Sequence, residues 1–264
     1  MSNLETLKST LATRFPVDRY LFSTAFGDTA IVIPKEDVVA LLTHLRATGT
    51  FDFLMDVCGA DYPARAKRFD VVYHLFNSKN GNRLRIKVAL AEGEVIDSVI
   101  NVWKAADWFE REAYDMFGIV FRGHPNLRKI LTHHQFVGHP LRKDYEADRQ
   151  QHCTTSLPVH FDNEPGSPGD VLNEKYVPLN IGPSHPAMHG TLRVMCEIDG
   201  ETIVRAGVEI GYLHRCFEKM AETHPYNQVI PYTDRLNYCS APMNNVGYCK
   251  TVEKLLGVEI PLSH

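Results

Sequence analysis

The residues best placed for chemistry lie in one short stretch, residues 181–190, which reads Ile-Gly-Pro-Ser-His-Pro-Ala-Met-His-Gly. The prolines restrict the backbone and the glycines permit geometry that other residues resist, so we expect a stiff loop that holds His185 and His189. Strand patterns at 176–181 and 191–198 flank it, and a loop held between strands is a common way to build a site. Imidazoles can transfer protons near neutral pH. The alternative is a tight connector with two solvated histidines.

A second group of candidates lies in two charged stretches, residues 110–131 and 138–145. Charges of both signs are interleaved there with aromatic residues and two Gly-His-Pro turns. We interpret them as an extended segment that lies against a partner protein. The alternative is a solvated loop, which would carry fewer large apolar residues. The candidate interface residues are Glu112, Asp115, Arg128, Arg142 and Asp144.

Several kinds of site are not indicated by the sequence. The six cysteines are scattered and none forms a Cys-x-x-Cys pair, which argues against an iron–sulfur or structural zinc site. We find no glycine-rich nucleotide loop and no phosphate loop. We therefore expect this chain to bind no metal and no cofactor. The net charge of −4 does not support nucleic-acid binding. No apolar run of about 18 residues occurs, so no transmembrane helix is expected. The lack of an export signal predicts a location in the cytoplasm.

Residues 1–145 show the pattern of an α+β domain. Helices are expected at 4–11, from Pro34 to Gly49 and at 106–116, and strands at 19–23, 29–33, 51–58, 69–75, 84–90 and 95–102. The clearest feature is a hairpin in which apolar residues alternate on both sides of Asn80-Gly81. Alternation of this kind is typical of antiparallel strands with one buried face. We predict a mixed, mostly antiparallel sheet with helices on one face.

The remaining residues divide into a linker and a second domain. Residues 146–173 are polar and contain Gly166-Ser-Pro-Gly-Asp170, which indicates a linker. Beyond it, Asp199-Gly200 predicts a hairpin turn between strands 191–198 and 201–206. A helix face follows at 213–220, and a further helix is expected to begin at Asp234 and to kink or split at Pro242. The predicted domains are therefore 1–145 and 174–264.

The motifs resemble two neighbouring parts of respiratory complex I, the proton-pumping NADH:quinone oxidoreductase. Residues 108–144 resemble the signature of its C-type (30-kDa-type) component. Residues 174–264 are similar to the start of its D-type (49-kDa-type) component, in the motifs 180–193, 210–215, 231–238 and 252–257. Some bacteria fuse these two components in this order. Because the D-type component normally continues far beyond residue 264, the resemblance implies a truncated fusion whose second part begins a [NiFe]-hydrogenase-large-subunit-like domain with a β-hairpin and helices.

The resemblance implies a role in quinone reduction. His189 would hydrogen-bond one quinone carbonyl and Tyr238 the other pole of the headgroup, while Arg235 would lie near a [4Fe–4S] cluster held by a neighbouring protein of the complex. The implied partners are the B-type iron–sulfur, I-type ferredoxin-like and H-type membrane subunits. The implied location is peripheral, on the cytoplasmic side of the bacterial inner membrane, where the complex couples NADH oxidation to ion translocation. The isolated chain is expected to be inactive.

The same motifs leave two alternative functions. Membrane-bound [NiFe]-hydrogenases share this ancestry, but their large subunit needs an early Cys-x-x-Cys, and Asn237 and Ser240 occupy those places here. A truncated scaffold that docks without catalysis is the other alternative.

Overall fold

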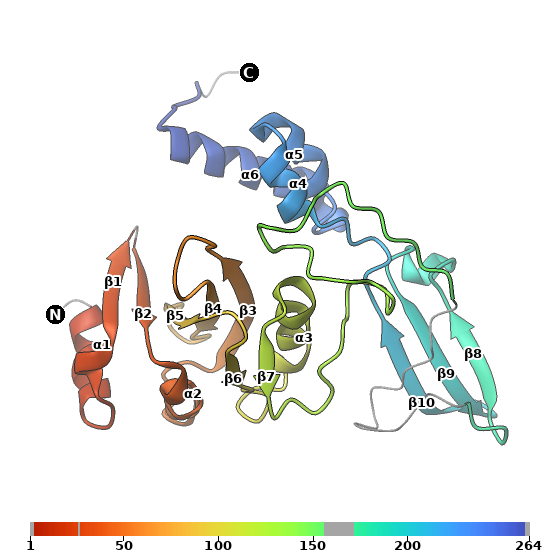
Figure 1. The fold of residues 1–264 in the computed structure, drawn as a ribbon, viewed down its shortest axis with the longest axis horizontal. Coiled ribbons are helices and arrows are strands. Elements are labelled where there is room, and N and C mark those ends of the chain that lie inside the picture. The colour runs from red at the N-terminus through yellow and green to blue at the C-terminus, as the bar shows by residue number, and fades with distance from the viewer. Residues whose placement is uncertain (1–2, 26, 156–171, 262–264) are drawn as a thin grey trace. The chain divides into compact units, whose positions relative to one another are not determined.

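The computed structural model describes residues 3–25, 27–155 and 172–261, and Figure 1 labels their helices and strands. The chain divides into two compact units: residues 1–145 with 150–213, and residues 146–149 with 214–264. This division differs from the one drawn from the sequence at 146–173, which stays a prediction. Residues 156–171 of that predicted linker lie outside the described residues.

The first unit contains a five-stranded mixed sheet in the order β1-β2-β5-β4-β3. Its strands are β1 (Leu21–Ala25), β2 (Asp28–Val32), β3 (Phe53–Asp61), β4 (Phe69–Phe76) and β5 (Arg83–Leu90). The β2–β5 pair is parallel and the other three pairs are antiparallel. The predicted hairpin is confirmed as β4 and β5, in which alternate residues such as Val71, Tyr73, Ile86 and Val88 are completely buried.

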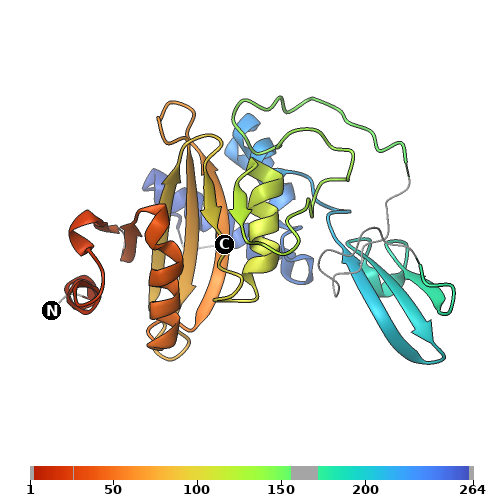
Figure 2. The same ribbon diagram turned by 60° about the horizontal axis from the view of Figure 1, so that its bottom comes forward.

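Helices accompany this sheet as predicted. They are α1 (Asn3–Ala12), α2 (Val38–Ala47) and α3 (Ala106–Phe117), and Figure 2 shows α2 lying along one face of the strands. Gly118 ends α3 in the left-handed conformation with φ 77°, which suits glycine. Gly59 of β3 allows α3 to approach closely, because a Cβ there would lie 2.5 Å from the Phe117 ring.

Two expectations about this region are wrong. The strand expected at 95–102 is only β6 (Val95–Asp97), which pairs in parallel with the unpredicted β7 (Val120–Arg122). The Ser98 amide still bonds the Arg122 carbonyl of β7, but the Val99 amide turns to the Glu110 carboxylate, so the pairing goes no further. The charged stretch from residue 110 is also not extended throughout, because its first part belongs to α3.

A three-stranded antiparallel sheet in the order β10-β9-β8 completes the first unit. It consists of β8 (Val177–Ile181), β9 (Arg193–Asp199) and β10 (Thr202–Glu209). The predicted turn at Asp199-Gly200 joins β9 to β10, and Gly200 has φ 62°. The loop with both candidate histidines joins β8 to β9.

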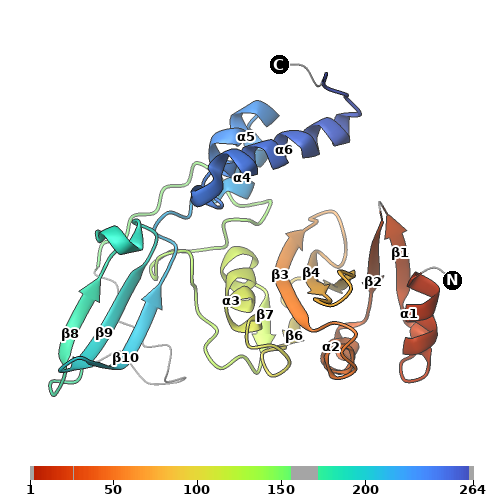
Figure 3. The same cartoon turned by 180° about the vertical axis from the view of Figure 1, so that it is seen from behind.

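The second unit is helical and contains α4 (Phe217–Thr223), α5 (Tyr226–Thr233) and α6 (Ala241–Leu256), which are drawn together in Figure 3. The prediction that Asp234 begins a helix is wrong, because Asp234 directly follows the end of α5. Pro242 does not kink α6 because it lies in the first turn, where a missing N–H breaks no helical hydrogen bond. Among the described residues, every helix is too short or too polar to cross a membrane.

Candidate functional site

His189 lies on a loop whose backbone is set by a few particular residues. The short helical turn η3 (Pro186–Met188) is preceded by His185, whose Nδ1 accepts a hydrogen bond from the Ala187 amide at 3.2 Å. His185 therefore shapes the loop, as expected. His189 follows η3 in the left-handed conformation, with φ 55°, and its side chain is exposed. Gly182 has φ 87°, and a Cβ there would lie 2.5 Å from the Leu192 carbonyl oxygen.

Hydrogen bonds tie the base of the His189 loop to all three strands of the small sheet. Asn180 donates to the Gly182 carbonyl at 3.0 Å and accepts from Arg193 Nε at 2.6 Å. Arg193 also reaches Glu209 of β10, with 3.2 Å between nitrogen and oxygen. Thr191 Oγ1 donates to the Met188 carbonyl at 2.8 Å. The loop is therefore held at both ends, which is the preorganisation that a binding imidazole needs.

The other two candidate residues of the quinone site belong to the second unit. Tyr238 begins the helical turn η4 (Tyr238–Ser240) and is 41% exposed. Arg235 is exposed, and its Nε lies 3.8 Å from Asp234 Oδ1, which is a weak ion pair. Because His189 belongs to the first unit and Tyr238 to the second, their joint contact with one headgroup stays a prediction.

Among the candidate interface residues, Asp115 has an internal role. Its side chain is fully buried on α3. One carboxylate oxygen accepts hydrogen bonds from the amide N–H groups of Ile130, Leu131 and Thr132, at 3.1, 2.8 and 2.9 Å. The other accepts Thr132 Oγ1 at 2.6 Å. Asp115 therefore holds the chain after β7 against α3, a function that the sequence pattern did not indicate.

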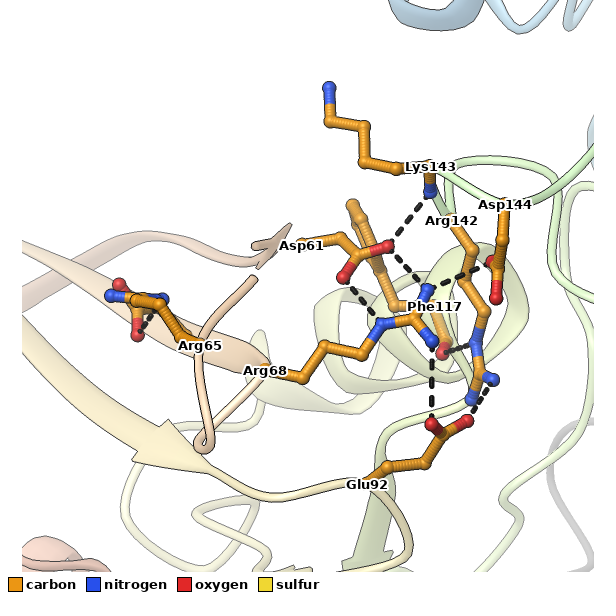
Figure 4. Close-up of polar contacts among 9 residues, drawn as sticks. Asp61, Arg65, Arg68, Glu92, Phe117, Arg142, Lys143 and Asp144 are labelled. Carbon is orange, nitrogen blue, oxygen red and sulfur yellow. Dashed lines mark hydrogen bonds and ion pairs between the residues drawn. The ribbon is translucent and has the colours of Figure 1, made fainter. Parts of the chain in front are cut away.

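Arg142 and Asp144 join a charged network that attaches residues 139–145 to the sheet (Figure 4). At its centre Arg68 makes a two-point contact with the covered Asp61 carboxylate, with Nε–O and Nη2–O distances of 2.7 and 2.8 Å. Arg68 also reaches Asp144 at 2.8 Å. Burial opposes ionisation of Asp61, but hydrogen bonds from Arg68 and the Lys143 amide hold its pKa below the usual range.

Arg142 forms the second branch of the same network. Its Nε donates to the Phe117 carbonyl at the end of α3, at 2.6 Å, and its Nη1 donates to Glu92 at 2.8 Å. Glu92 also accepts from Arg68 at 3.3 Å, which joins the two branches. Arg142 thus binds one of the last carbonyl groups of α3, a position that favours a cation.

Glu112 and Arg128 have more open positions. Glu112 is exposed on α3, and Arg128 lines a pocket of about 440 Å³ within the first unit. The pocket is bounded by segments 127–134 and 208–212 and by two residues of α3, Arg111 and Tyr114. An interface role for the five charged residues stays a prediction.

Glu110 is a buried carboxylate that the sequence pattern did not single out. Its side chain is fully buried on α3 and accepts hydrogen bonds from Ser98 Oγ at 2.6 Å and from the Val99 amide at 2.7 Å. Burial raises the pKa of Glu110 to about 7, although both hydrogen bonds favour the ionised form. In the sequence, the only indication that Glu110 is buried is its position among the apolar residues of the helix.

Comparisons with known proteins agree on one family. Residues 31–151 match the family described as "Respiratory-chain NADH dehydrogenase, 30 Kd subunit". The C/D subunit of NADH-quinone oxidoreductase from Bdellovibrio bacteriovorus is 74% identical over 261 residues, which cover 99% of this chain and 47% of that protein. The protein of the same description from Acidiphilium cryptum is 40% identical over 267 residues, which cover 93% of this chain and 45% of that protein.

A weaker likeness is found to a solved structure of the membrane-bound sulfane sulfur reductase (MBS), an archaeal respiratory membrane complex. It has a TM-score of 0.44 and 20% identity, over 54% of this chain and 84% of that chain. The chain spans about half the length of the curated relatives it matches. The sequence similarity to those relatives nevertheless covers nearly the whole chain and includes both predicted parts. Over nearly its whole length this chain is therefore similar to the fused C/D subunits of NADH-quinone oxidoreductase, and residues 31–151 match the 30-kDa subunit family.

Proposed function

We propose that this chain is part of the peripheral arm of an NADH:quinone oxidoreductase, where it helps to form the quinone-reduction site. The observation that carries the proposal is the 74% identity to a C/D subunit of NADH-quinone oxidoreductase over 99% of the chain. The hydrogen-bonded loop that presents His189 adds a second, independent support, because it holds an exposed imidazole at a defined position.

Quinone reduction delivers two electrons and two protons to two carbonyl oxygens. In this proposal His189 donates a hydrogen bond, and then a proton, to one oxygen. Tyr238 stabilises the developing negative charge on the other through its hydroxyl. Arg235 lies near a [4Fe–4S] cluster in a neighbouring protein of the complex, where its charge stabilises the reduced cluster. This chain supplies no redox cofactor of its own.

The charged motif of the first unit serves assembly. The proposed partners are the B-type iron–sulfur, I-type ferredoxin-like and H-type membrane subunits, on the cytoplasmic side of the bacterial inner membrane. Asp115 holds the backbone of residues 130–132, which follow Arg128 closely, and the Arg68 network holds residues 143–144, while the exposed Glu112 is carried by α3. The complex as a whole couples electron transfer to ion translocation.

The decisive variant is Tyr238→Phe in the assembled, full-length complex, because it removes one hydroxyl and little volume. If the hydroxyl bonds the quinone in the transition state, its loss costs about 3–4 kcal/mol of barrier, which is roughly a 100- to 1,000-fold loss of quinone reduction. Electron transfer from NADH to an artificial acceptor should be unchanged. Tyr226→Phe, which removes a hydroxyl from another exposed tyrosine of the second unit, is the matched control.

His189→Asn tests the proposed hydrogen bond to the other carbonyl oxygen of the quinone. Asparagine tolerates the left-handed conformation of residue 189, so this variant removes the imidazole while keeping the backbone preference. Quinone reduction should fall while assembly is retained. A fully assembled complex in which both Tyr238→Phe and His189→Asn reduce quinone at the normal rate would refute the site and leave a scaffold role.

A further inference from the structure

A group of three potential metal ligands lies on the outer face of the five-stranded sheet. It consists of Asp56 and Cys58 on β3 and His74 on β4. One donor atom from each side chain lies within 4.8 Å of the other two. All three side chains are half-buried, and none belongs to the residues used in the proposed quinone site.

A β-bulge in β3 sets which of its residues lies opposite His74. Leu54 and Val57 are both in the core although they are three residues apart, which regular alternation forbids. The register shifts between Leu54 and Asp56, so that one extra residue reverses the alternation. Asp56 and Cys58, two residues apart after the shift, point to the same side by ordinary alternation, and the shift places Asp56 instead of Met55 directly opposite His74 in the β3–β4 pairing.

The donor set suits a borderline-soft divalent ion. A thiolate, an imidazole and a carboxylate are the three kinds of protein ligand that zinc takes. In a tetrahedral zinc site such donors lie about 3.5 Å apart, so small side-chain rotations would close this group around an ion. A pocket of about 360 Å³, lined by Asp56 and His74 among others, leaves room for a water as the fourth ligand.

We propose that Asp56, Cys58 and His74 form a binding site for a divalent transition-metal ion of the zinc type, with three protein ligands and one open position. The sequence pattern gave no sign of it, because clustered cysteines are the usual signal and these ligands come from two strands. The ion is distinct from any redox cofactor and needs no electron transfer.

Binding at this site requires the Cys58 thiol to lose its proton. Burial and the neighbouring Asp56 raise the pKa of this thiol to about 12, so the thiol is protonated in the metal-free protein at neutral pH. Burial, helped by Arg85, lowers the pKa of His74, so its imidazole is neutral and ready to bind. Among the described residues, other charged groups around the site are Arg83 and Lys87 of β5, Asp28 of β2 and Glu112 of α3.

Cobalt(II) titration of the purified 264-residue chain tests the site, because cobalt(II) occupies zinc sites and its thiolate complexes absorb light. We expect thiolate-to-metal absorption that saturates at one ion per chain and disappears when zinc is added. Cys58→Ser should abolish the absorption. Loss of a group that only hydrogen-bonds a metal ligand typically lowers metal affinity roughly 10- to 100-fold. Because His74 is proposed as a direct ligand, His74→Gln should lower the affinity for cobalt(II) by more than this.

Cys153→Ser is the matched control, because Cys153 is an exposed thiol elsewhere in the chain. Each variant is first checked for an unchanged circular dichroism spectrum and melting temperature, and Asp56→Asn replaces any variant that fails. Absorption that persists in Cys58→Ser, unchanged cobalt affinity in His74→Gln, or absorption that is lost in Cys153→Ser would overturn the site. The absence of thiolate absorption in the parent chain would do the same.

Discussion

Substitution of Asp115 by alanine should destabilise the first unit through the chain after β7. The Asp115 carboxylate is fully buried and accepts three consecutive amide N–H groups, those of Ile130, Leu131 and Thr132. It also accepts the Thr132 hydroxyl at 2.6 Å. Alanine removes every one of these acceptors and leaves the three amides facing an apolar methyl group.

The size of the effect follows from the exposure of the three amides. A buried donor left without a partner costs about 1–3 kcal/mol. Residues 130–132 are only half-buried, so water replaces part of the lost acceptor and the lower end of the range applies to each. The three amides together give a loss of about 3 kcal/mol in the free energy of unfolding. That loss is roughly a 100-fold change in the ratio of folded to unfolded protein.

Urea unfolding measures the loss, and amide hydrogen exchange locates it at residues 130–132. Two milder variants serve as controls. Asp115→Asn keeps an oxygen for the three amides, and Thr132→Val removes only the hydroxyl bond, at a cost of about 1 kcal/mol. A loss below about 1 kcal/mol in Asp115→Ala, or unchanged exchange at these amides, would show that Asp115 does not hold the segment.

The remaining predictions concern a buried acid, an ion pair and the histidine loop. Glu110→Gln keeps the hydrogen-bonding positions but removes a group whose pKa is raised from 4.5 to about 7 in the folded state. A raised pKa means that the folded state holds the proton more tightly, so wild-type stability falls as pH rises from about 4.5 through 7. The variant should gain roughly 3 kcal/mol relative to wild type over that window, and parallel pH profiles in urea titrations would contradict this. Arg68→Ala leaves a covered carboxylate without its main partner and should cost roughly 3 kcal/mol, whereas Arg122→Ala breaks an exposed pair and should change stability little. Equal melting temperatures for those two variants would argue against the network. Gly182 and Gly190 both have positive φ, but only at 182 does a Cβ meet the backbone. Gly182→Ala should therefore reduce quinone reduction in the assembled complex much more than Gly190→Ala, and similar activities would show that the loop geometry is unimportant.

Much of the fold could be predicted from the sequence because its signals are local. The alternation of apolar residues in 69–75 and 84–90 predicts the β4–β5 hairpin, and Gly118 marks the end of α3. The turn at Asp199-Gly200 is equally local. Where the local signal was ambiguous, the prediction failed: Asp234 resembles a helix start, but the helices before and after it are placed by packing and by Pro242.

For the candidate site as well, local features could be predicted from the sequence, whereas the burial of individual side chains could not. The sequence alone identified the His189 loop, its rigid residue types and the resemblance that makes His189, Tyr238 and Arg235 candidates. It did not establish that Asp115 and Glu110 turn inward, because their position among apolar residues of the helix is a weak signal until the helix is packed.

Only the tertiary structure decided which distant residues meet. The parallel β2–β5 pairing, the contact of Arg68 with Asp144, and the group of Asp56, Cys58 and His74 all depend on strand register and chain path. In the last of these, a single extra residue in β3 shifts the register so that Asp56 instead of Met55 lies opposite His74. Register is set by the packing of the whole buried face, so a periodic pattern predicts that a strand exists but not which partner each side chain will face.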